Sequence, residues 1–424
     1  MTNLYFQRFI PKRSEYISFF TLLSATFFMW GFLTCNNTIL IPHVMNIFQL
    51  SFLQAQMLNF SFFGTYLIMS APMGKLVNKI GYKNSMIVGL IIAGYACTLF
   101  GPASTIRSYS LFLLAMVVMA SGITLLQVAA NPYVVLLSDY TQSASKLTLK
   151  QGFNALGTTL APILGSFVFY FMSFTAEEMS LMSPADYRKA EAEIVQIPYL
   201  GLAAIMFMLA FAMFFSKIPN LETHQAEPEV KKGKGTLKYV LQIPHLYLGV
   251  IAIFLYVGAE VGIGTFLVNV LVSPTLGGED FYEAPQYVTL YWAGAMVGRF
   301  VGYFFLPKIE TGKAVAIAAI ISALLVLCFI YGSGMFAVSL LISVGLFNSI
   351  LFPCIFTLGV ERLGKFSEEG SSLLVMGIAG GAIIPLMMGA LINEIGLQKI
   401  FFIPLLCYVV IIFYGLAGSR INKE

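Results

Sequence analysis

The stretch IFLYVGAEVGIGTFLVN, residues 253–269, places one charged side chain, Glu260, in a run that is otherwise almost wholly apolar or small. About 20 apolar residues are the length that an α-helix needs to cross the hydrocarbon core of a bilayer. A carboxylate at the centre of such a helix costs about 2.5–3.5 kcal/mol on the insertion scale, and intramembrane acids mark functional sites. To assign the fold, we ask whether this stretch is one membrane span among many. To assign the function, we ask what Glu260 does there.

The composition of the whole chain indicates a membrane protein. Of its 424 residues, 58% are hydrophobic and 10% are charged, whereas a soluble domain carries about 25% charged residues. An all-α membrane protein with twelve transmembrane helices is therefore predicted, located in a plasma membrane such as the bacterial inner membrane. Its apolar runs lie at residues 18–44, 53–78, 83–103, 109–137, 148–174, 194–216, 246–273, 285–308, 312–333, 335–362, 370–394 and 400–420.

The distribution of Lys and Arg predicts the orientation, because cytoplasmic loops of membrane proteins carry an excess of these residues. If both termini are cytoplasmic, nineteen of the 24 Lys and Arg residues fall on the cytoplasmic side, four fall in outer loops, and only Arg299 lies inside a span. We therefore predict both termini to be cytoplasmic. The same census of the 20 acidic residues leaves only Glu260 near mid-membrane.

The longest polar stretch, which is rich in Lys and interrupted by Gly and Pro, divides the chain into two sets of six spans. We expect this stretch to be a cytoplasmic linker. The predicted segments are an N-terminal cytoplasmic segment (1–17), a first six-helix bundle (18–216), the linker (217–245), a second six-helix bundle (246–420) and a C-terminal tail (421–424).

Three local patterns occur in both halves in the same order. Gln127 and Asn348 each stand five residues before a proline, and so do Gly157 and Gly380. The third pattern is GKLVNKIGYK (74–83) in the first half and GYFFLPKIETGK (302–313) in the second. These matches predict two parallel repeats, and such repeats enclose a binding site at their interface near the midplane.

Polar side chains within the spans predict a central cavity, because an amide or hydroxyl exposed to lipid is unfavourable. Two pairs lie at i, i+4 or i, i+3 spacing and so share one helical face. For any single amide, hydrogen bonding between helices is as good an explanation as ligand contact, whereas their number favours a ligand that needs many hydrogen bonds. The predicted substrate contacts are Asn36, Asn37, Thr38, Asn59, Gln127, Asn131, Gln151, Asn154, Glu260, Trp292 and Asn348. Among them, Trp292 could stack on the apolar face of a sugar ring or simply pack against lipid and other helices.

The basic turn GKLVNKIGYK contributes Lys75 and Lys79, which we predict, together with Arg299, to take part in a conformational gate. Orientation of the chain by positive charge explains the two lysines whatever else they do. The five cysteines all lie in apolar runs, where a small buried side chain is a better interpretation than a disulfide or a metal site.

The twelve spans, the repeat and the GKLVNKIGYK turn resemble the major facilitator superfamily. Longer strings, notably SGITLLQVAANPYV (121–134), LTLKQGFNALGTTLAP (147–162), YVGAEVGIGTFLVN (256–269) and LYWAGAMVGRFVG (290–302), resemble the fucose-galactose-glucose:proton symporters. The resemblance covers nearly the whole chain and is closest to the glucose/galactose or N-acetylglucosamine branch. It implies the major facilitator fold and the transport of a monosaccharide.

Two positions depart from the fucose symporter pattern. The resemblance implies carboxylates on the first and fourth spans as proton-linked groups, but the matching residues here are Thr38 and Gln127. Neither can take up a proton at ordinary pH. Gln151 and Asn154, which match the family's sugar-contacting helix, are present, and Glu260 is left as the only central titratable group.

We therefore expect a secondary transporter that imports a hexose or a related sugar by alternating access, coupled to a cation through Glu260. Burial penalises a charged carboxylate, so Glu260 could bind a proton outside and release it inside. It could instead help to hold Na⁺, or only hydrogen-bond the sugar in an uncoupled uniporter, with Arg299 as a distant charge partner. A channel and a polytopic membrane enzyme are lesser alternatives, since there is one central charge and the three histidines lie at span ends or in the linker.

The remaining expectations concern partners. We expect a sugar, H⁺ or Na⁺ and the lipid bilayer as partners of a monomer. We expect no enzymatic activity, no cofactor, no metal and no nucleic acid.

Overall fold

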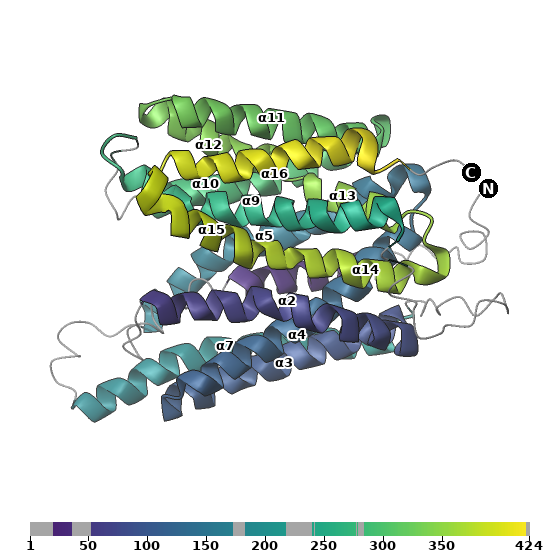
Figure 1. The fold of residues 1–424 in the computed structure, drawn as a ribbon. Coiled ribbons are helices and arrows are strands. Elements are labelled where there is room, and N and C mark those ends of the chain that lie inside the picture. The colour runs from purple at the N-terminus through teal and green to yellow at the C-terminus, as the bar shows by residue number, and fades with distance from the viewer. Residues whose placement is uncertain are drawn as a thin grey trace.

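The computed structural model of the chain describes residues 20–35, 52–172, 183–217, 240, 242–276, 278 and 284–420. Throughout these residues the regular structure is helical. The helices run side by side, with those of the first half (purple to teal) on one side of the molecule and those of the second half (green to yellow) on the other (Figure 1). Each of the twelve predicted spans corresponds to a helical segment, and the predicted linker lies mostly outside the described residues.

In the described residues of the first half there are six long helices. They are the helix Phe20–Cys35, α2 (Phe52–Ile80), α3 (Tyr82–Ile106), α4 (Tyr109–Leu136), α5 (Ser143–Met172) and α7 (Pro184–Phe215), with the short η1 (Tyr140–Gln142) before α5. The polar side chain of Ser108 caps α4 by accepting a hydrogen bond from the Leu111 amide at 3.3 Å, which satisfies one of the free N–H groups of the first turn. The α7 helix begins at Pro184 and therefore includes residues that the sequence placed in an outer loop.

The second half repeats this plan with more interruptions. It contains α9 (Pro244–Val272), α10 (Ala284–Phe305), η2 (Leu306–Lys308), α11 (Thr311–Tyr331), α12 (Gly334–Asn348), α13 (Leu351–Val360), η3 (Gly364–Phe366), α14 (Ser367–Met376), η4 (Gly377–Ala379), α15 (Gly380–Ile395), η5 (Lys399–Phe401), α16 (Phe402–Phe413) and η6 (Tyr414–Gly418). The tenth span is thus split into α12 and α13, and the eleventh into α14 and α15. Pro353 explains the first split, because a proline has no N–H for the carbonyl four residues earlier, that of Ser349.

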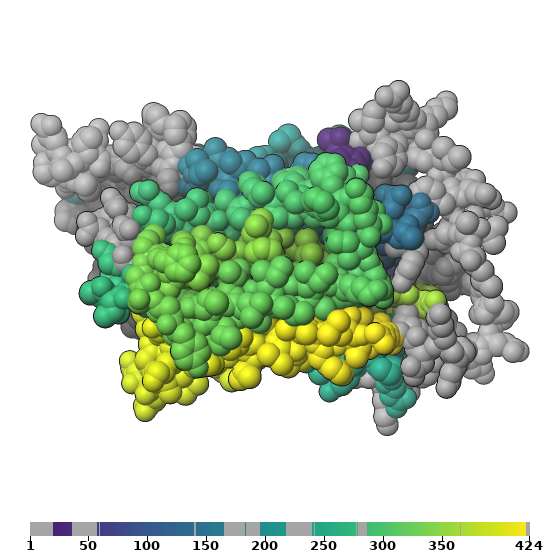
Figure 2. Space-filling model, turned by 90° about the horizontal axis from the view of Figure 1, so that it is seen from above, coloured from purple at the N-terminus to yellow at the C-terminus, as the bar shows by residue number. Residues whose placement is uncertain are grey.

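Most of the helices are long and apolar enough to cross a membrane. Among the described residues, eight helical segments meet both criteria, and the apolar helix Phe20–Cys35 is shorter. The helices α2, α5 and α10 do not belong to this set. Large apolar side chains such as those of Leu324 and Leu406 remain exposed on the outside, as a lipid-facing surface requires. Figure 2 looks onto the face formed by the second half, where helices α11 and α16 lie.

A close helix contact at a glycine occurs at equivalent positions in both halves. The two glycines are those that the sequence repeat places five residues before a proline. A Cβ atom at Gly157 of α5 would collide with the carbonyl of Phe28 in the first span, and one at Gly380 of α15 would collide with the carbonyl of Phe254 in α9. Each glycine therefore lets two helix backbones touch, which is the usual reason for small residues at membrane helix contacts. The equivalence of the two contacts supports the predicted duplication.

The bracing helices also repeat. In the first half α3 packs on α4 and α7, and in the second half α11 packs on α12 and α16. The two halves meet chiefly through two helix pairs, α2 with α14 and α5 with α10. Figure 1 shows the first pair along the boundary between the two sets of helices. The space between these two pairs is where a site shared by the halves has to lie.

The charged side chain of Lys150, in α5, is buried. Its ammonium group donates to the Phe20 carbonyl at 3.0 Å and to the Ser24 hydroxyl at 2.7 Å, and lies over the Phe20 ring. These contacts take the place of water around the charge, and they tie α5 to the beginning of the first span.

A candidate sugar site between the two halves

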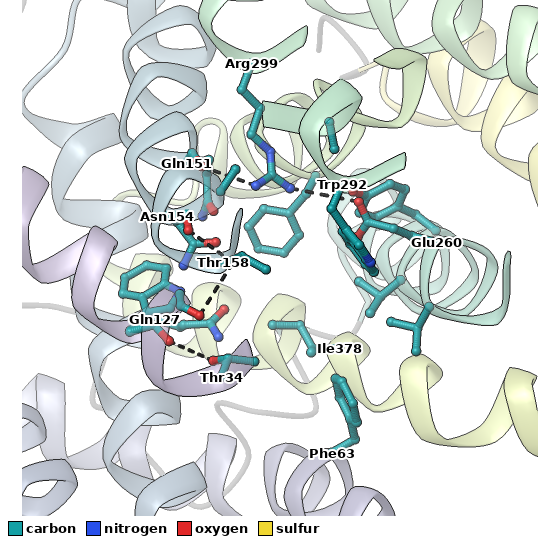
Figure 3. Close-up of a pocket in the computed structure, with 18 of the residues that line it drawn as sticks. Thr34, Phe63, Gln127, Gln151, Asn154, Thr158, Glu260, Trp292, Arg299 and Ile378 are labelled. Carbon is teal, nitrogen blue, oxygen red and sulfur yellow. Dashed lines mark hydrogen bonds and ion pairs between the residues drawn. The ribbon is translucent and has the colours of Figure 1, made fainter. Parts of the chain in front are cut away.

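A cavity of about 180 Å³ lies between the two halves of the molecule. Both halves supply its walls, and Figure 3 shows the side chains that converge on it. The lining residues come from eight of the predicted spans. They are Trp30, Gly31, Thr34, Phe63, Tyr66, Gln127, Gln151, Asn154, Ala155, Thr158, Tyr256, Val257, Glu260, Val261, Trp292, Ala295, Arg299, Phe352 and Ile378.

The first half provides an amide-rich wall. Gln127 of α4 donates to the Tyr66 hydroxyl at 3.0 Å, and Gln151 of α5 donates to the side-chain amide oxygen of Asn131 at 3.0 Å. Asn154, one turn further along α5, donates to the Phe27 backbone carbonyl at 3.1 Å. An amide has two N–H donors and one carbonyl acceptor, so each of these bonds orients an amide while using one donor. The wall can therefore present oriented hydrogen-bonding groups to a polyhydroxylated ligand.

The second half provides a charged pair in a largely apolar wall. The Arg299 Nη2 atom lies 3.9 Å from the Glu260 Oε1 atom, and both side chains are about 10% exposed. Arg299 also donates from Nε to the Ser349 carbonyl at 3.3 Å and from Nη1 to the Gln151 carbonyl at 3.2 Å. Figure 3 shows the guanidinium between Gln151 on one side and Glu260 on the other. The pair thus stands where the two walls of the cavity meet.

Two tryptophans lie in opposite walls. Trp30 of the first span packs on Phe27 with ring centroids 4.2 Å apart. Trp292 of α10 is held edge-on by Tyr291 at a centroid distance of 5.1 Å. Gly264 lies against it, because a Cβ there would be 3.0 Å from the Trp292 ring. The Trp292 ring is therefore fixed in the cavity wall, where an indole can stack on the C–H face of a sugar ring.

The structure brings six of the residues singled out from the sequence to the cavity: Gln127, Gln151, Asn154, Glu260, Trp292 and Arg299. Asn36, Asn37 and Thr38 lie outside the described residues, as does the side chain of Asn59.

Two predicted contacts are not in the cavity wall, and their assignment is corrected. Asn348 is fully buried behind the wall, where it donates to Tyr291 at 3.2 Å and accepts from Tyr408 at 2.8 Å. The Tyr291 hydroxyl in turn donates to the backbone carbonyl of Glu260 at 3.1 Å. Asn348 therefore holds helices together beneath Glu260. Asn131 is likewise fully buried and acts by orienting Gln151.

The three predicted gate residues lie in different parts of the molecule. Arg299 is not a distant partner of Glu260, because α9 and α10 bring the two side chains together as an ion pair. Lys75 and Lys79 are exposed at the end of α2. The turn that carries them contacts the second half through neighbouring residues.

Those neighbouring contacts form a polar junction between α2, α3 and α14. Asn78 donates to Glu369 at 3.0 Å, and Tyr82 donates to Glu368 at 3.0 Å. Gly74 lies nearby against Ser372, with 2.6 Å between a Cβ built on the glycine and that of the serine. Asn78, Tyr82, Glu368 and Glu369 thus join the two halves at this end of the helices, and we call them the junction residues.

Several lining residues were not singled out from the sequence. Thr158 follows Asn154 by one helical turn, so the spacing that predicted Gln151 and Asn154 could have predicted it as well. Trp30, Tyr66 and Tyr256 sit in aromatic, apolar surroundings that carry no comparable signal. Within the described part of the chain, no three His, Cys, Asp or Glu side chains come together as metal ligands would.

Comparison with known proteins identifies the family. The model of the Major Facilitator Superfamily matches residues 22–384. The chain is 45% identical over 400 residues to a glucose/galactose transporter of Brucella abortus, covering 94% of each chain. It is 31% identical over 414 residues to the L-fucose-proton symporter of Escherichia coli, covering 96% of this chain and 94% of that one.

A solved structure shares the whole fold. The crystal structure of the major facilitator transporter FucP in the outward conformation is similar with a TM-score of 0.87 and 30% identity, covering 96% of this chain and 100% of that chain. The resemblance drawn from the sequence motifs and the twelve-helix membrane fold are therefore confirmed, as is the prediction of a multi-pass protein of the inner membrane. The family and the structural neighbours are transporters and not enzymes. This chain belongs to the Major Facilitator Superfamily.

Proposed function

We propose that the protein is a secondary transporter that imports a monosaccharide by alternating access. The observation that carries the proposal is the cavity between the halves, with oriented amides in one wall and an indole in the other. A sugar offers hydroxyl groups to the first wall and a C–H face to the second. The relatives named as glucose/galactose transporters favour a hexose of that kind as the substrate.

We propose that sugar movement is coupled to a cation through Glu260. Among the described residues that line the cavity, Glu260 is the acid, and it stands beside the one cationic side chain, that of Arg299. One charge crossing a potential of about 100 mV supplies about 2.3 kcal/mol, and a tenfold sugar gradient requires about 1.4 kcal/mol. One proton per sugar is therefore sufficient. Proton coupling is favoured because a relative is named as a proton symporter, and Na⁺ coupling and uncoupled transport are the alternatives.

We also propose the orientation of the protein in the membrane and its oligomeric state. With both termini cytoplasmic, the junction residues close the cytoplasmic side, and the cavity would load from outside. The similarity to a structure in the outward conformation supports this assignment. We propose the monomer as the working unit, because one chain supplies both walls of the cavity.

Reconstitution in liposomes tests the transport proposal. Vesicles loaded with unlabelled glucose or galactose should accumulate the labelled sugar transiently from outside, because a carrier returns loaded faster than empty. A pore would give no such trans-stimulation, and an enzyme would alter the labelled sugar chemically. Protein-free vesicles are the control, and wild-type protein that exchanges no hexose of a tested panel would overturn the proposal.

Imposed gradients in the same vesicles test the coupling. Inward H⁺ and Na⁺ gradients are applied separately to the wild type and to Glu260→Gln, which keeps the shape of the side chain and removes its charge. The wild type should respond to the H⁺ gradient, and the variant should exchange sugar without responding to it. Equal responses of both proteins would exclude Glu260 as the coupling group, and the absence of any response in the wild type would favour a uniporter.

A further inference from the structure

Arg299 has contacts on three structural elements besides its own helix. Its guanidinium pairs with Glu260 of α9 at 3.9 Å. It also donates to two backbone carbonyls, that of Ser349 between α12 and α13 at 3.3 Å and that of Gln151 in α5 at 3.2 Å. The first two partners belong to the same half as Arg299, and the third belongs to the other half. A guanidinium presents its donors in a rigid planar fork, so holding it by two partners fixes its direction toward the third.

Pro353 creates one of these partners. In a regular helix the amide of residue 353 would donate to the carbonyl of residue 349, but a proline has no N–H to donate. The Ser349 carbonyl is left for Arg299, and the helix is interrupted at this point, between Asn348 and Leu351. Pro353 is part of the repeat pattern in the sequence. In the second half it also frees the backbone carbonyl that accepts from Arg299.

A second backbone carbonyl, on α10, is released in the same way. Pro307 leaves the Tyr303 carbonyl without its usual helical donor, and the Ser145 hydroxyl of α5 donates to it at 2.7 Å. The contact between α5 and α10 thus contains two hydrogen bonds that join the halves, one from Arg299 and one from Ser145. Phe153 and Phe300 pack edge-on between them at 5.9 Å.

Glu260 is the partner of Arg299 whose charge can change. The other ionisable groups around it are Tyr256 on its own helix, Tyr291 on α10 and Tyr408 on α16, besides Arg299 itself. In the described part of the chain, Glu260 Oε1 and the Tyr256 hydroxyl are buried and neither meets a hydrogen-bond partner. The guanidinium at 3.9 Å is therefore the only charged partner that the described residues give this oxygen atom.

We propose that Arg299 is a positioning residue that transmits the charge state of Glu260 to the contact between α5 and α10. An ionised Glu260, together with the Ser349 carbonyl, aims the guanidinium at Gln151 and holds the two halves together. A neutral Glu260 loses its charge attraction for the guanidinium, so the hold on α5 weakens and the two helices can separate. This inference rests on the proposed function, because it supplies the link between cation binding and movement of the halves.

The test compares Arg299→Lys and Pro353→Ala with the wild type. A lysine keeps the positive charge, but its single ammonium group cannot reproduce the planar fork. Alanine at 353 restores an N–H that competes for the Ser349 carbonyl without touching the cavity. Pro102→Ala is the matched control, since Pro102 lies inside the bracing helix α3, which supplies no cavity residue. Each protein is reconstituted, and its sugar affinity, exchange rate and pH dependence are measured.

If the proposal is correct, the two variants should keep their sugar affinity but exchange sugar more slowly. Both Arg299→Lys and Pro353→Ala should bind sugar within about threefold of the wild type, measured by equilibrium dialysis. The exchange rate should fall at least tenfold in Arg299→Lys and severalfold in Pro353→Ala, and the pH dependence of exchange should flatten in both. Pro102→Ala should keep the rate and the pH profile of the wild type.

Three outcomes would overturn the proposal. Loss of sugar affinity in Arg299→Lys with an unchanged pH profile would make Arg299 a sugar contact. A wild-type rate and pH profile in Pro353→Ala would show that the released carbonyl does not position Arg299, and this variant decides the matter if Arg299→Lys fails to fold. A wild type that exchanges sugar at a rate independent of pH would leave no charge signal to transmit. A wild type that exchanges no sugar would instead refute the proposed function, so the two failures can be told apart.

Discussion

At the residue scale, the amides inside the helical bundle have two different tasks. Gln127 faces the cavity and Asn348 lies behind it, although both stand five residues before a proline. Their surroundings differ because Gln127 meets one hydroxyl, that of Tyr66, whereas Asn348 is bonded by two tyrosines. Two substitutions by alanine can separate these tasks.

Gln127→Ala should impair sugar binding more than stability. A neutral hydrogen bond is worth about 0.5–1.5 kcal/mol, so the KM for uptake should rise roughly threefold to tenfold, while the unfolding temperature in detergent changes little. Uptake kinetics and circular dichroism measure the two quantities. An unchanged KM would show that Gln127 does not contact the sugar.

Asn348→Ala should show the opposite pattern. The substitution leaves the buried Tyr408 hydroxyl without its acceptor, at a cost of about 1–3 kcal/mol. It also removes one of the two hydrogen bonds of the Tyr291 hydroxyl, which still donates to the Glu260 backbone carbonyl. The unfolding temperature should therefore fall clearly, and the KM of the protein that remains folded should stay near the wild-type value. A raised KM at an unchanged unfolding temperature would return Asn348 to the sugar site.

Some residues of the site could be identified from the sequence, but their contacts with one another could not. Glu260 stands out because one charge in an apolar run needs no neighbour to be noticed, and the spacing of Gln151 and Asn154 marks one face of one helix. The pairing of Glu260 with Arg299 depends on the packing of α9 against α10. Local periodicity carries no information about such a contact.

At the element scale, the contact between repeated helices depends on glycine. Gly157→Ala and Gly380→Ala would each push a methyl group into a backbone carbonyl of the facing helix, and a backbone cannot move aside as a side chain can. Overpacking of this kind costs about 1–3 kcal/mol, so the unfolding temperature of both variants should fall. Gly201→Ala on α7 is the control, because no atom lies within 4 Å of its added Cβ. A drop in the control equal to that in the two variants would contradict the steric explanation.

The junction residues allow a prediction about the opening of the halves. A hydrogen bond to a charged group contributes about 1.5–3 kcal/mol, so Asn78→Ala and Tyr82→Phe should each favour separation of α2 from α14. Ser372→Cys, which replaces a buried serine at this contact, can report the separation through its rate of alkylation, with exposed Cys328 replaced by serine in every protein. We expect that rate to rise about tenfold when either bond is removed.

Lys75→Ala provides the matched control for this experiment, because Lys75 lies on the same turn but is exposed to solvent. Its effect on the alkylation rate should be small. If Lys75→Ala accelerates alkylation as much as Tyr82→Phe does, general weakening of the turn would explain the result, and the specific hydrogen bonds would not.

The elements themselves could largely be predicted from the sequence. Length and apolarity located all twelve spans, since a bilayer imposes one minimum length on every helix. The interruptions at Asn348–Leu351 and at η4 were not predicted, although Pro353 was noticed as part of a repeat. Whether a proline only bends a membrane helix or releases a carbonyl for another side chain depends on which donor lies next to it, and that is a property of the packed bundle.

At the scale of the whole molecule, the two helix pairs that chiefly join the two similar halves differ in chemistry. The pair α2 and α14 uses side chains on both partners, Asn78 with Glu369, whereas the pair α5 and α10 uses side-chain donors and backbone carbonyls. The sequence predicted the duplication and the shared cavity. It could not predict this asymmetry, because both pairs derive from the same repeat and differ only in their contacts.

The placement of the tryptophans has a practical consequence. The chain has two tryptophans, Trp30 and Trp292, and both line the cavity, one in each half. Ultraviolet light absorbed by indole therefore excites no reporter elsewhere in the protein, and a bound sugar changes the polarity around both emitters. Intrinsic fluorescence of the unmodified protein should follow occupancy directly, and Trp30→Phe and Trp292→Phe, each leaving one emitter, would show separately how each half senses the ligand.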